Sequence, residues 1–501
     1  MQSTLIQNTT YSDFLDNFKK SLNRAFYEID DISKFTQQRG FPDPVLKEIM
    51  NQSPLSVAIP TEYGGRGVKV KECLGLLEAA SYESLALSLT FGINIALFLE
   101  PVAKYGQDSM KEKVFQRFIN QQNMGGLMIT EPDFGSDALN MQTSCEPEGD
   151  GFRIKGTKHW QGLTGMADYW LMTCRSKNEQ GELGRDLDFF ITDEQAKGQD
   201  IKVTEYFNNI GLYPIPYGRN EVDVLVPQEN KLIPESTGLK LMMDLLHRSR
   251  LQFPGMAIGF VKRMLDEAVE HCNKRFVSGK PLIALDQVKF RISQLQSAFT
   301  VASSLCFRSS KMSGIEENVA GAGIEANCMK AYATDLMQRS AQTVTQLKGA
   351  NGYKMESYAG RGIMDSRPFQ VFEGSNEMLY TQISEMVLKI VGRKKFTNLA
   401  DFIPQYKLTE NVASYFKSIF NFNIDFDMPQ RKLVDLGKAL SRVVCANHVI
   451  ELGKSGFKSD LIESCLTNLV NEANALISNM HNPSTIVDDS YNENSSWLSL
   501  V

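Results

Sequence analysis

One change of pattern constrains the fold most: a stretch of short β-like runs interrupts an otherwise helical chain. Between about residues 123 and 232, runs rich in β-branched and aromatic residues alternate with turn sequences such as EGDG and YPIPYG. The runs are FRIKGTKHW, YWLMTCRS, LDFFITD, IKVTEYF and EVDVLVP. This pattern predicts a small antiparallel sheet or barrel. On both sides of it, apolar residues recur at three- and four-residue spacing, which predicts helices.

The sequence therefore divides into four predicted regions within a mainly α fold. They are an N-terminal helical domain (1–122), a middle β domain (123–235), a C-terminal helical bundle (236–395) and a helical extension (396–501). Long helices are expected at 239–275, 284–314, 323–348, 376–392, 408–419, 430–453 and 459–480. Because ligand sites favour domain interfaces, we expect a ligand where the β module meets the helices.

Charge and composition exclude several classes of function. The 501 residues carry a formal net charge of −6, and the extension has eight Lys or Arg against twelve Asp or Glu. Such a chain lacks the basic field that nucleic acid requires. The eight cysteines show no CxxC spacing, and none of the five histidines is paired at ligand spacing. We therefore expect no metal site and no disulfide framework.

The sequence also carries expectations about location. The first residues lack the order of a secretory signal, and no arginine precedes Arg24, so no transit peptide is expected in this form of the chain. The apolar stretch LALSLTFGINIALFLEP is interrupted by polar residues and Gly92, and we expect a buried helix rather than a membrane span. A cytoplasmic location follows, with the mitochondrial matrix left open for a processed form.

The segment FQVFEGSNEML places a carboxylate, Glu373, where an apolar run passes into a predicted helix. Apolar neighbours desolvate a carboxylate and raise its pKa, which makes it a stronger base near neutral pH. Gly374 allows a ligand to approach the backbone closely. The alternative is that Glu373 only caps the helix or forms an ion pair at its start.

Six segments resemble the acyl-CoA dehydrogenase family, in the same order along roughly residues 25–392. They are IPTEYGGRG (59–67), MITEPDFGSD (128–137), IKGTKHW (154–160), HRSRLQFPGMAIGFVKRMLDEAVEHCNKR (247–275), QLKGANGY (346–353) and FEGSNEM (372–378). The resemblance implies that family's α–β–α fold, an FAD cofactor and a role in fatty acid metabolism. It also implies α,β-dehydrogenation of an acyl thioester: Glu373 removes the α-proton while the β-hydrogen leaves as hydride to flavin N5.

The same resemblance implies the remaining site residues. Flavin contacts fall on Met128, Thr130, Gly135, Ser136, Trp160, Gly162, Ser375 and Glu377. Arg275 and Gln287 match positions that reach the FAD of a neighbouring subunit, and Gln346 and Gly349 match the loop that receives it, which implies at least a homodimer. Substrate contacts fall on Ser136, His247, Arg250 and Gly374. From the residues alone, Trp160 also suits a strand core, Ser136 a helix cap and His247 a cavity wall.

Several positions depart from the family pattern on the flavin side. Gly162 stands where Ser or Thr is usual, Ser278 replaces an aromatic residue, Ala350 a glycine and Met364 an arginine, while Ser375 conservatively replaces threonine. These departures predict altered flavin contacts around a retained catalytic carboxylate. The extension resembles that of the very-long-chain branch in size and helical character. Its acidic balance favours extra dimer burial over membrane association.

Three hypotheses about the function are consistent with the sequence. The first is an FAD-dependent acyl-thioester dehydrogenase that passes electrons to an electron-transfer flavoprotein, with coenzyme A or an acyl-carrier protein as the thioester carrier. The second is an acyl-CoA oxidase or another O₂-using flavoenzyme of the same fold, although Glu373 argues against a hydroxylase. The third is a non-catalytic, partner-binding paralogue.

Overall fold

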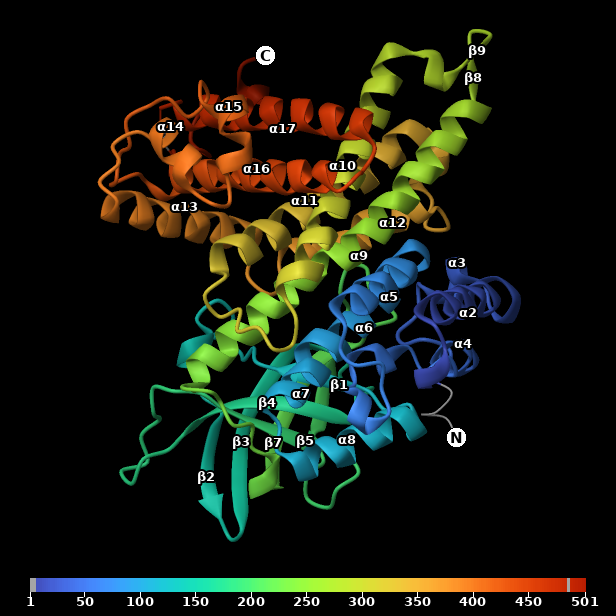
Figure 1. Ribbon diagram of the computed structural model, residues 1–501, viewed down its shortest axis with the longest axis vertical. Coiled ribbons are helices and arrows are strands. Elements are labelled where there is room, and N and C mark those ends of the chain that lie inside the picture. The colour runs from blue at the N-terminus through green and yellow to red at the C-terminus, as the bar shows by residue number, and fades with distance from the viewer. Residues whose placement is uncertain (1–5, 484–486) are drawn as a thin grey trace.

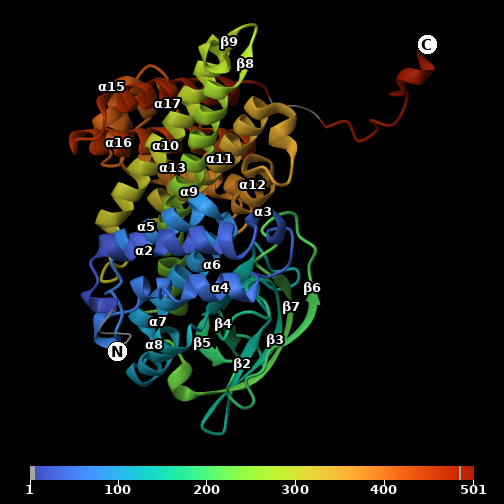
Figure 2. The same ribbon diagram turned by 90° about the vertical axis from the view of Figure 1, so that its right-hand side faces the viewer.

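The computed structural model describes residues 6–483 and 487–501, which form, in chain order, a helical region, a sheet, a helical bundle and a helical extension (Figure 1). The β domain and the extension lie at opposite ends of the molecule, and the long helices of the C-terminal bundle run between them (Figures 1 and 2). The N-terminal helices lie beside this bundle and against the β domain. The order helix, sheet, helix, extension confirms the predicted fold class.

The N-terminal region is helical, with two helices extended by π-helical turns. Its elements are α2 (Tyr11–Asn23), η1 (Arg24–Ile29), α3 (Ile32–Phe35), α4 (Asp43–Met50), η2 (Pro54–Ala58), η3 (Thr61–Tyr63), α5 (Val70–Glu83), α6 (Leu85–Asn94), η4 (Ile95–Leu99), α7 (Glu100–Tyr105) and α8 (Asp108–Gln121). The continuous segment Leu85–Tyr105 is long and apolar enough to cross a membrane by length and composition, contrary to expectation. Its apolar window is wholly buried inside the protein, as predicted for a core helix.

The middle region is one curled sheet with strand order β1-β4-β2-β3-β7-β6 and β5 paired to β4. The strands are β1 (Gly125–Met128), β2 (Ser144–Glu148), β3 (Gly151–Gly162), β4 (Tyr169–Ser176), β5 (Asp188–Asp193), β6 (Lys202–Tyr206) and β7 (Tyr217–Pro227), and η6 (Gln228–Asn230) follows. The prediction of a purely antiparallel sheet was wrong, because β4 runs parallel to both β1 and β2. The short runs of β1 and β2 carry little alternation, so the sequence did not indicate them.

Burial explains the two kinds of strand. Strand β7 buries every second residue, as expected for a sheet with one solvated face. Strand β4 is buried from Tyr169 to Cys174, because α6 and η4 pack over this part of the sheet. The apolar segment formed by α6 and η4, called the wall helix below, therefore lies between the sheet and the C-terminal bundle. This is the junction at which a ligand is expected.

The C-terminal bundle consists of α9 (Gly238–Lys274), α10 (Asp286–Met312), α11 (Gly323–Lys348), α12 (Tyr358–Ser366) and α13 (Asn376–Arg393), with 3-10 turns η7 (Leu282–Ala284), η8 (Gly349–Tyr353) and η9 (Arg367–Gln370). A two-stranded hairpin, β8 (Phe276–Val277) with β9 (Lys280–Pro281), joins α9 to α10. The predicted long helices here match to within two residues at either end. Their apolar periodicity continues almost to the terminal residues, which is why the bounds are so well predicted.

The extension comprises α14 (Leu399–Phe402), η10 (Ile403–Gln405), η11 (Glu410–Val412), α15 (Ala413–Phe416), α16 (Gln430–Lys454), α17 (Ser459–Met480) and η12 (Trp497–Ser499). Helix α16 packs on α13 and α10, and α17 packs on α10. The helix predicted at 408–419 is present only in part, as η11 and α15 over residues 410–416. Val412, Phe416 and Phe420 bury at helical spacing, but the Asn411 N–H donates to Asn447 Oδ1 (3.0 Å) instead of to a preceding carbonyl.

Candidate active site

Glu373 lies immediately before α13 in an unusual backbone conformation. Its φ is +53°, in the left-handed region that a non-glycine residue rarely adopts, and Gly374 follows with φ +91°. Such conformations persist only where the surroundings hold them, and they concentrate at functional sites. The two residues turn the chain sharply and direct the glutamate side chain away from the helix that it would otherwise cap.

The Glu373 carboxylate is desolvated on one side and hydrogen bonded on the other. Ser249 Oγ donates to Oε1 at 3.0 Å. The Oε2 atom is buried and has no hydrogen-bond partner among residues 6–483 and 487–501. Burial raises the pKa of this carboxyl, and Ser249, Arg250 and Lys330 oppose that rise. An unpartnered, desolvated carboxylate oxygen is what a general base for a carbon acid requires.

Two buried cations hold the backbone of the glutamate turn. Arg250 donates from Nε (3.2 Å) and Nη2 (2.9 Å) to the Glu373 carbonyl, while its Nη1 donates to Asn327 Oδ1 at 2.8 Å. Lys330 Nζ, which is fully buried, donates to the Gly374 carbonyl at 2.8 Å and to Asn376 Oδ1 at 3.1 Å. Burial lowers the pKa of Lys330 to about 7. Arg250 thus fixes the base rather than standing free in a cavity.

Three aromatic rings lie next to this turn. Phe253 of α9 lies 6.0 Å from Phe369 and 6.1 Å from Phe372, and the last two rings are 5.0 Å apart. Phe369 and Phe372 come just before Glu373 in the sequence, whereas Phe253 comes from α9. Their packing beside the carboxylate accounts for the desolvation that raises its pKa.

The sequence did not indicate Ser249, Asn327 or Lys330 as site residues. Ser249 precedes Arg250 on α9, and its small hydroxyl gives no signal in isolation. Lys330 did carry one: a lysine at the centre of the apolar periodicity of α11 must be buried, and buried lysines are rare unless paired.

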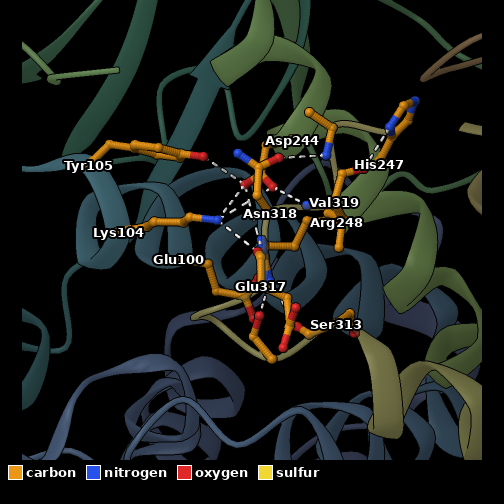
Figure 3. Close-up of polar contacts among 12 residues, drawn as sticks. Glu100, Lys104, Tyr105, Asp244, His247, Arg248, Ser313, Glu317, Asn318 and Val319 are labelled. Carbon is orange, nitrogen blue, oxygen red and sulfur yellow. Dashed lines mark hydrogen bonds and ion pairs between the residues drawn. The ribbon is translucent and has the colours of Figure 1, made fainter. Parts of the chain in front are cut away.

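His247 belongs to a different polar cluster on α9 (Figure 3). Its Nδ1 lies 3.0 Å from the Val319 carbonyl, and burial lowers the pKa of the ring. The cluster centres on Asp244, which accepts from Tyr105 (2.9 Å) and from the Val319 N–H (2.7 Å). Arg248 donates to three carbonyls of the loop between α10 and α11. His247 therefore anchors this loop, and in the structure its ring faces Val319 rather than Glu373.

The TEPDFGSD loop, predicted to contact flavin, follows β1 and is anchored by a buried ion pair. Lys158 Nζ of β3 lies 2.9 Å from Glu131 Oε1, and both side chains are almost fully buried. Glu131 also accepts from the Thr143 N–H at 3.0 Å. This ion pair fixes the loop next to Thr130, whose carbonyl accepts from Gln161 Nε2 at 3.0 Å. Gly135 and Ser136 remain exposed, whereas Met128 is buried within β1.

Trp160 and Gly162 lie at the end of β3, where the register with β7 shifts. Trp160 has φ +61°, is 51% exposed, and packs its ring 4.4 Å from that of Phe207. It is therefore not a core aromatic. A Cβ at Gly162 would lie 2.9 Å from Ile93 Cδ1 of the wall helix, so Ile93 occupies the space that a larger residue needs. This contact explains the departure at Gly162.

The remaining predicted cofactor residues are exposed and lie at other places. Arg275 is at the end of α9 and Gln287 at the start of α10, on either side of the protruding hairpin, while Gln346 and Gly349 lie at the end of α11 (Figure 1). Ser375 and Glu377 are exposed at the start of α13. Ser278 forms the hairpin turn with φ +49°, a conformation that disfavours bulky residues.

These residues offer the chemistry that FAD needs. Hydroxyls, an exposed indole, amides and a guanidinium suit an isoalloxazine edge and a pyrophosphate. The two groups of residues, one at the β domain and one at the hairpin, lie far apart in Figure 1. Within residues 6–483 and 487–501, no cluster of three or more His, Cys, Asp or Glu could hold a metal ion.

Comparison with known proteins agrees with this architecture. Family models for the N-terminal, middle and C-terminal domains of acyl-CoA dehydrogenases match residues 14–122, 126–223 and 236–388. The chain belongs to the acyl-CoA dehydrogenase family. Membership makes it an oxidoreductase of the acyl-CoA dehydrogenase type, and it confirms the resemblance on which the sequence prediction rested.

Individual relatives are distant. An acyl-CoA dehydrogenase of Bacillus subtilis is 24% identical over 353 residues, covering 70% of this chain and 90% of the relative. The human very long-chain specific mitochondrial enzyme is 22% identical over 75% of this chain but only 57% of its own length. An acyl-CoA dehydrogenase structure from Bacillus anthracis, complexed with FAD, superposes with a TM-score of 0.77 at 18% identity. It covers 96% of this chain and 90% of its own, so the fold of the extension is shared.

Proposed function

We propose that the protein is an FAD-dependent acyl-CoA dehydrogenase in which Glu373 removes the α-proton of a fatty acyl thioester. The observation that carries this proposal is the buried, unpartnered Oε2 of Glu373 on a strained turn. A glutamate that only capped α13 would direct its oxygens to the backbone N–H groups of the first helical turn. Here Oε1 accepts from Ser249 of another helix instead.

The residues around Glu373 divide the work of proton removal. Ser249 orients the carboxylate so that Oε2 is left to accept the proton. Arg250 and Lys330 fix the carbonyls of Glu373 and Gly374, which keeps the base in one place before substrate arrives. Gly374 has φ +91° and a Cβ there would lie 2.9 Å from Leu379 Cδ2, so the turn that carries the base requires glycine. Bound FAD would supply the acceptor for the hydride that leaves the β-carbon.

The placement of the cofactor residues supports a dimer. Thr130, Ser136 and Trp160 lie at the β domain, whereas Arg275 and Gln287 lie on the hairpin side of the bundle. We propose that the hairpin residues contact the FAD of a second copy, and that Gln346 and Gly349 receive its counterpart. An electron-transfer flavoprotein is the proposed electron acceptor, and a cytoplasmic location is proposed.

The proposal is tested by visible absorption of the purified protein, anaerobically, against acyl-CoAs of increasing chain length. We expect a flavin spectrum that is bleached by one range of chain lengths. Admission of air then separates a dehydrogenase, which stays reduced, from an oxidase, which is rapidly reoxidised. A protein that binds no flavin after FAD is added would overturn the proposal and favour a non-catalytic paralogue.

Glu373→Gln sharpens the test. We expect the variant to retain its flavin but to lose bleaching by at least about a hundredfold in rate, because the amide cannot accept the proton. Glu385→Gln, at an exposed position of the same helix, is the matched control and keeps the wild-type rate. Residual turnover near the wild-type level in Glu373→Gln would remove Glu373 from its role.

A further inference from the structure

Helix α16 of the extension packs against α13, the helix that begins just after Glu373. Helix α16 comes so close to α13 that a Cβ at Gly437 would lie 1.9 Å from the Tyr380 carbonyl oxygen. Tyr380 is fully buried and lies seven residues after Glu373. One turn further along α16, Arg442 is only 5% exposed and lies over the ring of Tyr332 at 4.0 Å. A buried cation of the extension thus lies against α11 and α13, about two helical turns from Glu373 along α13.

A continuous line of hydrogen bonds joins Arg442 to that turn. Arg442 Nη1 lies 3.4 Å from the Tyr380 hydroxyl, and this hydroxyl lies 2.7 Å from Asp335 Oδ2. Asp335 Oδ1 accepts from Asn376 Nδ2 at 2.7 Å. Asn376 Oδ1 accepts from Lys330 Nζ, which also donates to the Gly374 carbonyl.

The chemistry of the groups fixes each donor and acceptor along this line, and both ends of the line donate toward Asp335. A guanidinium can only donate, so Tyr380 accepts from Arg442 and must give its own proton to Asp335. The Asp335 carboxylate accepts, so the nitrogen of the Asn376 amide faces Asp335 and its oxygen faces Lys330. Each orientation depends on the next, and networks of this kind act as units. Without Arg442 the Tyr380 hydroxyl loses the donor that fixes its rotation.

We propose that Arg442 is a positioning residue for the catalytic glutamate, so that the extension completes the active site. This inference rests on the proposed function. Glu472 of α17 holds Arg442 in place by accepting from Nε at 3.0 Å, and it also accepts from the Tyr332 hydroxyl at 3.1 Å. Arg442 in turn holds the polar line whose far end fixes the Gly374 carbonyl.

The test compares kcat and KM of the full-length holoenzyme for the acyl-CoA that bleaches the wild type best. We expect Arg442→Met to lower kcat about tenfold with KM changed less than twofold, since misplacement of the base affects the reaction and not binding. Arg442→Lys should recover part of the loss because it keeps the donor. Arg339→Met, which breaks a second ion pair of Glu472 (3.0 Å) without touching Tyr380, should keep the wild-type kcat.

Tyr380→Phe removes only the hydroxyl and provides a second route if Arg442→Met fails to fold. We expect a similar fall in kcat, and the double variant should fall no further than either single one, because both interrupt the same line. Wild-type kcat in both single variants, with the wild type itself active, would overturn the inference. A wild type whose flavin no acyl-CoA bleaches would instead overturn the proposed function.

Discussion

The turn at Glu373 and Gly374, called the glutamate turn, differs from the surface that carries the predicted flavin residues, called the flavin face. One chain supplies the contacts that hold the glutamate turn, but only part of the flavin face. Around Glu373 the direct polar contacts come from α9, α11 and the start of α13, and Arg250 and Lys330 are buried and each bonds two different residues. On the flavin side, Gly135, Ser136 and Trp160 are exposed, and Arg275 and Gln287 extend from the other end of the bundle. A base must be fixed before substrate arrives, whereas a cofactor surface is completed by the cofactor itself and by a second copy.

This contrast also explains where the family pattern changes. The glutamate turn keeps the carboxylate, the glycine and the arginine that the family resemblance implies, and Arg250 bonds the Glu373 carbonyl. The departures at Gly162, Ser278, Ala350 and Met364 lie outside that turn. Ile93 occupies the space that a side chain at position 162 would need. The backbone of Met364 packs against Gly211, where an added Cβ would lie 2.6 Å from the Met364 carbonyl. Local packing therefore accounts for the departure at Gly162, and nothing in the structure explains those at Ala350 and Met364.

Among substitutions that leave Glu373 itself in place, Lys330→Met should lower kcat most, because it removes a support of the glutamate turn while leaving the flavin face intact. The substitution leaves the Gly374 carbonyl and Asn376 Oδ1 without their buried donor and removes a cation beside Glu373. We expect kcat to fall roughly a hundredfold while FAD stays bound, because Thr130, Ser136 and Trp160 lie at the β domain and not beside Lys330. Stopped-flow reduction of the flavin measures this. Lys389→Met, at an exposed position of α13, is the control, and an unchanged rate in Lys330→Met would show that the turn needs no such support.

Ser249→Ala tests the glutamate turn through the pH dependence of kcat. Burial raises the pKa of Glu373, and the hydrogen bond from Ser249 is the strongest influence that lowers it again. The base acts when deprotonated, so activity falls as pH falls through this raised pKa. Without the serine hydroxyl the pKa rises further, and the acid limb of the kcat profile moves to higher pH, with a loss of about tenfold near neutral pH.

The profile is measured between pH 5 and 9 for both enzymes. Ser304→Ala is the matched control, since Ser304 is also a buried helical serine and bonds only within its own helix, to the Val301 carbonyl at 2.7 Å. A shift of the acid limb to lower pH in Ser249→Ala would contradict the assigned hydrogen bond.

Gly162→Ser tests the flavin face through stability. The new Cβ would meet Ile93 Cδ1 at 2.9 Å, so the wall helix must adjust, at a cost of about 1–3 kcal/mol in the free energy of unfolding. We expect Ile93→Val to recover part of this cost in the double variant. Gly321→Ser, where a Cβ meets nothing within 4 Å, should cost little. Equal stability of the Gly162 and Gly321 variants in denaturant titration would show that Ile93 does not fill this space.

Sequence reasoning captured the parts of this molecule that depend on local pattern. Helices α9, α11 and α17 follow from periodicity, whereas Glu373 and Trp160 were predicted as site residues only from the resemblance to the family's motifs. The parallel pairing of β4 with β1 did not follow, since strand order depends on contacts between distant segments. Ser249, Asn376 and Arg442 were also missed. Each is ordinary in its own segment and gains its role only when α9, α13 and α16 are packed together.

The smallest expected effect concerns the second contact between the extension and the bundle. His448 of α16 is buried, with Nε2 3.1 Å from Glu325 Oε1 and Nδ1 3.7 Å from Glu451, and Arg308 of α10 also bonds Glu325. Burial opposes the charged ring, but its two carboxylate partners prevail and raise the pKa of His448. Burial likewise opposes ionised Glu325, yet His448 and Arg308 lower the pKa of Glu325 to about 2.

These two shifts define a pH window for the stability of the extension. The raised pKa of His448 gives stability that is complete below its unfolded value of 6.5 and is lost as pH rises through the folded value. The lowered pKa of Glu325 gives stability that is present above 4.5 and is lost as pH falls toward 2. The pair therefore contributes most between these limits.

We expect the difference in unfolding free energy between the wild type and His448→Gln to be largest between these pH limits, about 1 kcal/mol or more, and to shrink at higher pH. His481→Gln, at an exposed position after α17, should show no such dependence. A difference that grew above pH 7 would mean that the ring is neutral against Glu325, and that the extension is held by Arg442 and apolar packing alone.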